Sequence, residues 1–385
     1  VRSHHRKAGM KITVVNGAFL PVPPIMGGAI EKMSLALANE FARRGHEVTS
    51  VSRAVPELPR EEVRDGVKFL RVPGFDTPGW IVWLKFLDLI YSIRVLRVLP
   101  VADIIVTHTF WLPILLRKER QGKVYVHVGR YPKGQMRLYR HAARFQAMTL
   151  ALARAIAREV PDCESKISII PNPAPETRMP GRPPPLEARA QTILFVGRIH
   201  PEKGIHLLID AFAGKPAAFE DWKLVIVGPA EKKFGGGGER YLADLKKRAE
   251  GAAISFRGPI FDPLALEDEF RSARLFVYPS LAERGETFGL AAVEAMAHGC
   301  PVVVSDLGCF HDFIRDNKTG FIFNHRAPHP ALALREKMAN AMASPVWLAR
   351  VAEAGYHHVT AEYSLSRVAD RFLDDFQLLL QNSNG

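Results

Sequence analysis

Cysteine is scarce in this sequence. Its 385 residues include three cysteines, Cys163, Cys300 and Cys309, whose spacing matches neither a metal-binding pattern nor a disulfide framework. A chain of this length can bury a large core without cross-links. We therefore expect a protein of the reducing cytoplasm with no metal site.

Long apolar runs and several binding motifs are also missing. No stretch of about 18 uncharged apolar residues occurs, so we expect no membrane-spanning helix. The first strand-to-helix turn lacks the G-x-G-x-x-G pattern, which argues against a nicotinamide-dependent enzyme. Aromatic residues do not alternate with basic ones and no nucleic-acid motif is present, so we expect no nucleic-acid partner.

Acidic residues are few in the first half of the chain. Residues 1–185 contain 29 Lys and Arg against 15 Asp and Glu, a net charge of +14. Residues 186–385 contain 23 against 25, a net charge of −2. This asymmetry predicts an acidic partner for the first half only.

Two successive series of alternating strands and helices make up most of the chain. Short apolar runs that alternate with helical periodicity predict two parallel sheets in a doubly wound α/β fold. Proline recurs between residues 171 and 185, which is typical of a domain boundary. We predict a tag or disordered segment at 1–9, domains at 10–176 and 191–362, a linker at 177–190, and a C-terminal helix at 363–385 that returns to the first domain.

The most informative stretch runs from residue 278 to residue 306. Two apolar runs predict parallel strands, and the periodic segment between them predicts a helix that begins near Phe288 and ends at Gly299. Glu286 then precedes the helix and Glu294 lies about two turns inside it, so helical rise would separate the two by about 12 Å.

The start of this helix suits an anion. The N–H groups of Phe288, Gly289 and Leu290 are predicted to lie between the two carboxylates, and a helix N-terminus favours negative charge. A diphosphate would fit there, with one carboxylate for a ribose and one for a sugar ring. The alternative is an exposed loop Glu and a helical Glu that pairs with an Arg.

The sequence of this stretch resembles the signature of the retaining glycosyltransferases of family 4. The resemblance is carried by E-T-F-G-L-A-A-V-E-A-M-A-H-G-C-P-V-V-V-S-D. The resemblance implies that Glu286 lies by the hydroxyls of the transferred sugar, that Glu294 holds the nucleotide ribose, and that the amides between them face phosphate and sugar. Two positions depart from the family's pattern: Thr287 stands where Gly or Ser is more usual, and Gly308-Cys309 replaces a common Gly-Gly.

Other segments extend the resemblance along the chain. F-V-G-R-I-H-P-E-K-G-I is similar to the family's phosphate-binding loop, in which Arg198 and Lys203 would stabilise charge on a departing diphosphate. The alternative for these two is a pair of exposed cations near a turn. In the same family the segment that includes Arg257, Pro259 and Ile260 holds the nucleotide base through backbone groups. We expect the glycine run 235–238 to be a flexible flap.

The first half carries weaker signals. Gly27-Gly28 opens a predicted helix and resembles the family's paired glycines, which approach donor phosphate or acceptor; a plain turn that needs glycine is the alternative. Two predicted strands end in His108 and His127, at the edge where parallel sheets bind ligands. A lone histidine there is more often structural, but the resemblance implies that His127 contacts the donor sugar, with His108 ranked second.

Two helices of the first half have unusual surfaces. Residues 80–99 predict a helix that is apolar almost all round. Residues 135–158 predict a second helix near whose start Lys133, Arg137, Arg140 and Arg144 would form one cationic stripe. Together they could form a surface for an anionic acceptor or lipid headgroups. The alternative is that the first is an ordinary buried helix and the second an ordinary solvated face.

The resemblance implies a GT-B fold, two Rossmann-like domains facing a cleft, and sugar transfer with retention from a nucleoside diphosphate, with UDP preferred to GDP. It implies a glycan, glycolipid or small-molecule acceptor, and neither a metal ion nor a cofactor beyond the nucleotide-sugar donor. Peripheral contact with an anionic inner membrane face is a further expectation. The alternatives are a sugar-nucleotide epimerase of the same fold and a non-catalytic nucleotide-binding protein.

Overall fold

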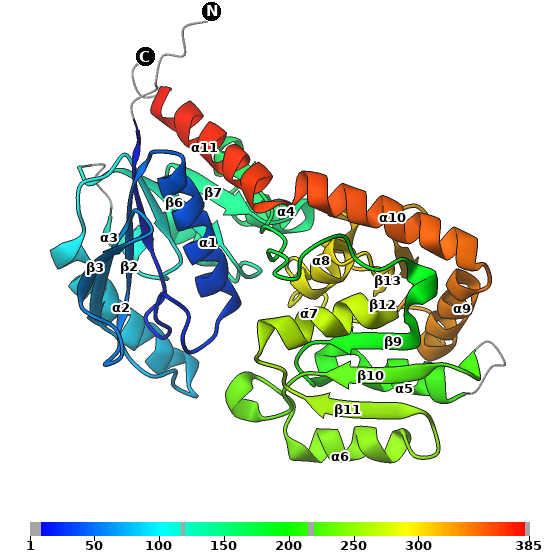
Figure 1. Cartoon of the computed structure of the whole chain (residues 1–385). Helices are drawn as coiled ribbons and strands as arrows, with labels where there is room; N and C mark the ends of the chain where they lie inside the picture. The colour runs from blue at the N-terminus through cyan, green and yellow to red at the C-terminus, as the bar shows by residue number, and fades with distance from the viewer. Residues whose placement is uncertain (1–8, 117–119, 215–218, 382–385) are drawn as a thin grey trace, which may run out of the picture. The chain divides into compact units, whose positions relative to one another are not determined.

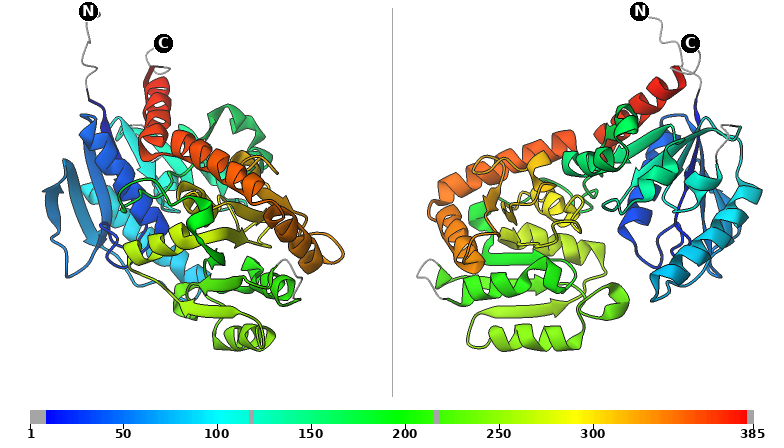
Figure 2. Two further views of the ribbon diagram at one scale, coloured as in Figure 1. Left: turned by 45° about the vertical axis from the view of Figure 1, so that its right-hand side comes forward. Right: turned by 180° about the vertical axis from the view of Figure 1, so that it is seen from behind.

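The computed structural model describes residues 9–116, 120–214 and 219–381. It consists of two compact units: one combines the chain up to Pro173 with the segment from Leu365 onward, and the other is Ala174–Ser364. The sequence-predicted linker 177–190 falls inside the second unit. Most of the predicted N-terminal tag, residues 1–8, lies outside the described residues. Figures 1 and 2 show that each unit is a twisted sheet with helices packed against it.

The first unit has an eight-stranded sheet in the order β3-β4-β2-β1-β5-β6-β7-β8. Its strands are β1 (Lys11–Val15), β2 (Glu47–Ala54), β3 (Glu61–Arg64), β4 (Val67–Pro73), β5 (Ile104–Thr107), β6 (Lys123–Val128), β7 (Arg144–Ala147) and β8 (Ile167–Ile169). All neighbours run parallel except β3, which pairs antiparallel with β4. The unit is therefore a doubly wound sheet with one added edge strand.

The helices of the first unit are α1 (Ala29–Arg43), α2 (Ile81–Val98), α3 (Leu112–Leu115), α4 (Leu150–Glu159) and α11 (Leu365–Gln381), with 3-10 turns η1 (Gln135–Tyr139) and η2 (Pro161–Lys166). The start of α1 at Ala29, directly after the paired glycines, agrees with the sequence prediction. In the part of the chain that is described, no helix is both long and apolar enough to cross a membrane.

Helix α11 completes the core of the first unit. Its Phe376 packs edge-on against Phe41 of α1 and Tyr125 of β6, with ring centroids 5.9 and 5.0 Å apart. The Tyr125 hydroxyl donates to Asp375 at 2.8 Å, and Arg144 forms an ion pair with the same carboxylate at 2.8 Å. The last described helix thus belongs to the first unit by both packing and hydrogen bonding.

The predicted helix over 135–158 is wrong. The segment forms η1, then strand β7, and only then α4. The four cations therefore make no common stripe: Arg144 lies on β7 and pairs with Asp375, while Arg140 pairs with Asp162 at 3.3 Å. A four-residue strand is too short to show its own period, and its Gln and Ala also suit a helix.

The second unit has a six-stranded, wholly parallel sheet in the order β11-β10-β9-β12-β13-β14. Its strands are β9 (Ala190–Val196), β10 (Lys223–Val227), β11 (Ile254–Gly258), β12 (Ala273–Tyr278), β13 (Val302–Ser305) and β14 (Phe321–Phe323). Its helices and turns are η3 (Leu186–Ala188), η4 (Pro201–Lys203), α5 (Ile205–Ala213), η6 (Lys232–Phe234), α6 (Glu239–Arg248), α7 (Pro263–Ser272), α8 (Leu290–Ala297), η7 (Phe310–Asp312), α9 (Pro330–Met342) and α10 (Pro345–Glu362).

Strand β9 lies in the interior of this sheet, between β10 and β12. The carboxyl ends of parallel strands share one edge of a sheet, which is where ligands of doubly wound folds bind. The loops that follow β9 and β12 carry most of the residues that the sequence singled out in this unit. The sheet therefore gathers them at one edge.

Candidate functional site

A buried ion pair marks the carboxyl edge of the second sheet. The Lys203 ammonium donates to a Glu286 carboxylate oxygen at 2.7 Å, and the two residues are only 7% and 8% exposed. They come from different loops, 83 residues apart in the chain. Of the predicted site residues, these two are in direct contact, which no local pattern in the sequence indicated.

Backbone contacts hold the two loops together. The Leu281 N–H, after β12, donates to the Glu202 carbonyl at 2.7 Å. Gly204 has φ +68°, and a Cβ there would overlap the carbonyl of Pro279. Glycine is needed at this point because the two loops approach too closely for a side chain. The position of Lys203 is thereby fixed relative to Glu286.

Tyr278, the last residue of β12, packs against the Lys203–Glu286 pair. Its ring lies under the Lys203 ammonium, with the nitrogen 5.2 Å from the ring centroid. Burial and the nearby Glu286 carboxylate raise the pKa of the Tyr278 hydroxyl well above its usual value. Tyr278 therefore remains a neutral hydrogen-bonding group beneath a charged pair.

Arg198 lies on the surface of the loop after β9. Its guanidinium donates to the Gly235 carbonyl at 2.6 Å and to Glu202 at 2.8 Å. The glycine run 235–238 is fixed by further backbone bonds, from Gly237 to Ile199 and from Gly238 to Ala230, both 2.8 Å. These bonds connect the run to the β9 loop and to Ala230, and the flexible flap expected from its composition stays a prediction.

Helix α8 begins at Leu290, two residues later than predicted. Gly289 precedes it with φ +83°, and a Cβ there would overlap the Phe310 ring. Glu294 is thus little more than one turn inside the helix rather than two. Because residues 286–289 are not helical, the separation of Glu286 from Glu294 does not follow from helical rise, contrary to the sequence prediction. The N-terminal amides of α8 still follow directly after Glu286.

The predicted base-binding segment lies at the end of β11. Arg257 is exposed and pairs with Glu269 on α7 at 2.9 Å, while Pro259 and Ile260 are half-buried. The Gly258 carbonyl accepts from the Gly228 N–H at 2.9 Å. This bond links the ends of β10 and β11 at the same sheet edge as the ion pair.

The two candidate histidines, His108 and His127, lie side by side in the first unit, with ring centroids 4.7 Å apart. Burial lowers the pKa of His127 to about 4, and that of His108 falls well below its usual value, mainly for the same reason. His127 Nδ1 is hydrogen-bonded to Gln146. Because both pKa values are lowered, the two histidines are uncharged at neutral pH. Both line a cavity of about 20 Å³ together with Ser34 and apolar side chains.

The paired glycines end at a helix N-terminus that already faces a carboxylate. Gly27 and Gly28 have φ +82° and +104°, and a Cβ on Gly28 would overlap the Glu31 carboxylate. Burial raises the pKa of Glu31, which is 8% exposed. Glu31 was not singled out in the sequence, although it lies three residues after the N-cap Gly28, the spacing of a capping carboxylate. The Glu31 carboxyl group lies beside Gly28, at the helix N-terminus where the resemblance implies a donor phosphate or an acceptor.

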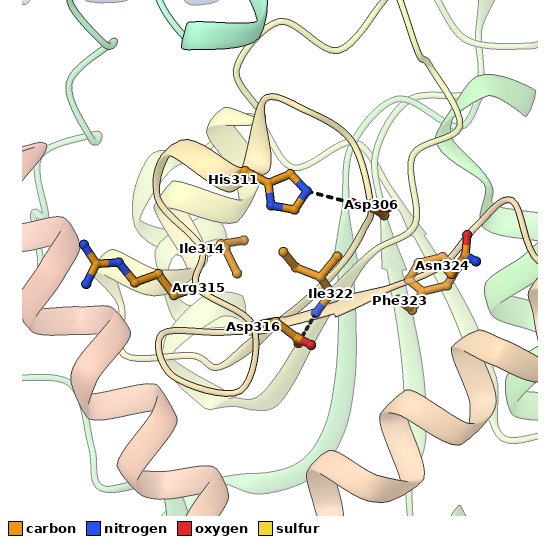
Figure 3. Close-up of a pocket in the computed structure, with 8 residues that line it drawn as sticks. All are labelled: Asp306, His311, Ile314, Arg315, Asp316, Ile322, Phe323 and Asn324. Atoms are coloured by element: carbon orange, nitrogen blue, oxygen red, sulfur yellow. Dashed lines mark hydrogen bonds and ion pairs between the residues drawn. The ribbon is translucent and has the colours of Figure 1, made fainter.

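An open pocket of about 410 Å³ lies beside edge strand β14. Figure 3 shows the residues that line it: Asp306, His311, Ile314, Arg315, Asp316, Ile322, Phe323 and Asn324. None of them is a predicted site residue, and Asp306 already pairs with His311 at 2.7 Å. We place the candidate site at the Lys203–Glu286 pair. Buried charged groups at the carboxyl ends of parallel strands are more typical of a functional site than exposed charges in an open pocket.

Metal ligands do not cluster in the residues that the structure describes. Within them, no group of three or more His, Cys, Asp or Glu side chains could hold a metal ion. Lys203 and Arg198 are the cationic side chains among the predicted site residues of the loop that follows β9.

The arrangement of two doubly wound parallel sheets, each with its candidate residues at the strand ends, is that of the GT-B fold. Family models match both units: "Glycosyltransferase Family 4" over residues 26–178 and "Glycosyl transferases group 1" over residues 182–358. The chain belongs to the family 4 glycosyltransferases.

Curated relatives carry related names. The chain is 27% identical to a phosphatidyl-myo-inositol mannosyltransferase of Mycobacterium leprae, over 93% of this chain and 95% of that protein. It is 30% identical to a D-inositol 3-phosphate glycosyltransferase of Segniliparus rotundus, over 51% of this chain and 42% of that protein.

Solved structures share the fold at lower identity. A sucrose-phosphate synthase from Thermosynechococcus elongatus superposes with a TM-score of 0.76 at 18% identity, covering 97% of this chain and all of that one. The Anabaena HepE protein, solved with UDP and glucose, gives a TM-score of 0.71 at 17% identity, covering 96% and 99%.

Proposed function

We propose that this glycosyltransferase moves a sugar from a nucleoside diphosphate to an acceptor hydroxyl with retention of anomeric configuration and without a metal ion. The observation that carries the proposal is the buried Lys203–Glu286 pair at the carboxyl edge of the second sheet. An enzyme that releases a diphosphate needs fixed positive charge where negative charge develops. Lys203 supplies that charge from a position that the surrounding backbone holds rigid.

The roles of the other residues follow from their positions. A diphosphate beside Lys203 would also meet the amides at the start of α8, while Glu294 on the same helix would take the ribose hydroxyls. Glu286 would accept hydrogen bonds from the transferred sugar. Arg198 would exchange its contact with Glu202 for phosphate oxygens, and the backbone at Pro259 and Ile260 would hold the base. His127 would contact the sugar from the first unit.

Retention needs no covalent nucleophile in this proposal. The departing diphosphate would accept the proton of the incoming hydroxyl on the same face of the sugar, so that the protein acts by placement and charge stabilisation. Lys203 and Arg198 would take the part that a divalent metal has in other transferases. We propose UDP as the nucleotide, with GDP second, because a protein of the same fold was solved with UDP.

For the acceptor we propose an inositol-containing molecule that carries phosphate. The names of two relatives, one acting on phosphatidyl-myo-inositol and one on D-inositol 3-phosphate, support this choice. The excess of basic residues in the first half of the chain is consistent with such an anionic acceptor.

The reaction is tested with the purified protein and a panel of UDP- and GDP-sugars, offered with D-inositol 3-phosphate or phosphatidylinositol. We expect a glycosylated acceptor whose anomeric proton coupling matches that of the donor, at the same rate with and without a chelator. Donor conversion without any acceptor would indicate an epimerase, and an inverted product or strict magnesium dependence would refute the mechanism.

Helix α2 supplies the surface that we propose for contact with an anionic membrane. Its first turns expose Val82, Trp83 and Phe86, which are 76%, 53% and 47% accessible, and the rings of Trp83 and Phe86 stack 5.1 Å apart. Its one acid, Asp88, is buried and accepts from the N–H groups of Phe110 and Trp111 at 3.0 and 3.1 Å.

The remaining charges on α2 are all cationic: Lys85, Arg94 and Arg97. Aromatic side chains beside cations suit the interface of a bilayer with anionic headgroups. Vesicle flotation tests this surface. Wild type should float with phosphatidylinositol-containing vesicles at low salt, and the double variant Trp83→Ser with Phe86→Ser should not. Val346→Ser, at an exposed position on α10, is the control. Failure of wild type to float would refute the membrane proposal.

A further inference from the structure

A buried hydrogen-bond chain determines the tautomer of His127. The Gln146 amide nitrogen, Nε2, donates to the Ile170 carbonyl, and Gln146 Oε1 is bonded to His127 Nδ1. A carbonyl oxygen can only accept, so the amide nitrogen must face Ile170 and the amide oxygen must face His127. Because that oxygen also only accepts, the proton of the neutral imidazole lies on Nδ1.

The sheet itself brings these two side chains together. His127 on β6 and Gln146 on β7 are register partners, so their side chains leave the sheet on the same face. Gln146 has no exposed surface. Burial keeps His127 uncharged at neutral pH, and the ionisable neighbour in ring contact with it, His108, is neutral for the same reason.

The second nitrogen, Nε2, therefore presents a lone pair. This nitrogen faces Gly129 and the first turn of α1. A Cβ added to Gly129 would lie 3.5 Å from His127 Nε2 and 3.6 Å from the Ile30 side chain. Within the described residues this atom is buried and has no hydrogen-bond partner. Any group that bonds to it must be a donor, and a sugar offers hydroxyl donors.

We propose that Gln146 is a positioning residue that holds His127 as a hydrogen-bond acceptor for a hydroxyl of the sugar substrate. Gln146 acts only through His127 and touches no substrate. The inference rests on the proposed function, in which His127 contacts the sugar. It adds that the contact runs from sugar hydroxyl to imidazole, so that a sugar lacking that hydroxyl loses the bond.

The tautomer is measured directly by nitrogen chemical shifts of the histidine ring in the 15N-labelled full chain. We expect protonated Nδ1 and bare Nε2 for His127 in wild type. Gln146→Leu removes the acceptor and should shift the ring toward the Nε2–H tautomer, with a loss of about tenfold in kcat/KM, the scale of one hydrogen bond. Gln146→Glu keeps an acceptor beside Nδ1 and should restore the wild-type tautomer.

Controls separate positioning from folding. Gln191→Leu, at an exposed position of β9, should change neither the His127 shifts nor the activity. An Nε2–H tautomer in wild type, or an unchanged tautomer in Gln146→Leu, would overturn the proposal. So would a shifted tautomer with unchanged kcat/KM. The spectra need no turnover, so absence of glycosyl transfer would count against the proposed function and leave the assignment of the tautomer intact.

Discussion

The two sheets differ in the buried candidate side chains at their carboxyl edges, which are charged in the second sheet and neutral in the first. At the carboxyl edge of the second sheet, a buried ammonium and carboxylate form an ion pair. In the first sheet, two neutral histidines and a glutamine are buried together at the carboxyl ends of β5, β6 and β7. Charge is used where a diphosphate would be stabilised, and neutral hydrogen bonding where hydroxyl groups would be placed. The predictions below test this contrast, from the largest expected effect to the smallest.

Lys203→Ala should have the largest effect, because it removes a charge and leaves Glu286 buried without its partner. Breaking a buried pair on one side typically costs about 3–5 kcal/mol of folding free energy. Loss of a preorganised charge should add about 2–3 kcal/mol to the transition state, roughly a hundredfold in kcat/KM. Chemical denaturation and steady-state kinetics measure the two effects.

The double variant Lys203→Met with Glu286→Gln separates them. It leaves no unpaired charge, so stability should largely return while activity stays low. Lys223→Ala, an exposed cation on β10, is the control and should alter neither quantity. Activity of Lys203→Ala within tenfold of wild type would show that the ion pair is only structural.

Arg198→Ala should reduce kcat/KM almost as strongly, by about 2–3 kcal/mol in the transition state. Its effect on the free energy of unfolding should be small because the side chain is exposed. Steady-state kinetics together with denaturation would show activity lost without stability. Loss of both in proportion would mean that Arg198 mainly anchors the loop at Gly235.

Glu294→Ala and Glu286→Ala should differ in kind. The first should weaken nucleoside diphosphate binding about tenfold or more, the scale of a charged hydrogen bond, whereas the second should lower mainly turnover. Titration calorimetry with UDP and GDP measures the affinity, and initial rates measure the turnover. Equal UDP affinity in wild type and Glu294→Ala would remove the ribose role.

The effect that is smallest at neutral pH concerns His127, whose contribution to stability changes only in acid. The pKa of His127 is about 4 in the folded protein against an ordinary 6.5, so the unfolded chain binds the proton more tightly. Its contribution to stability is therefore complete above about pH 6.5 and is lost as pH falls toward 4. His127→Gln should reduce the slope of the unfolding free energy against pH between about pH 4 and 6.5, by the equivalent of up to one bound proton. An identical pH dependence in both proteins would show that His127 is charged or exposed when folded.

Sequence patterns predicted the strands well and the contacts poorly. The parallel strands at Lys11–Val15, Lys123–Val128 and Lys223–Val227 lie where apolar runs indicated, because a strand buried on both faces is a continuous apolar segment. Strand β7 was mistaken for helix because four residues hold no measurable period. The error created a cationic stripe that does not exist.

The sequence indicated which residues belong to the candidate site but did not indicate which of them are in contact. Motif resemblance singled out Lys203 and Glu286, but their contact depends on how β9 and β12 pair across 83 residues of sequence. Gln146 escaped notice because its importance comes from a neighbouring strand, and a single buried glutamine has no pattern. The glycine run 235–238 shows the same limit, since composition does not reveal that Arg198 binds the Gly235 carbonyl.

The return of α11 to the first unit has a consequence for synthesis on the ribosome. The second unit is one continuous segment, Ala174–Ser364, and can fold as soon as it emerges. The first unit begins earlier yet lacks Phe372 and Phe376 until the last helix is made. Its sheet must wait with Phe41 and Tyr125 uncovered, so the half of the protein that is translated first is the half that matures last.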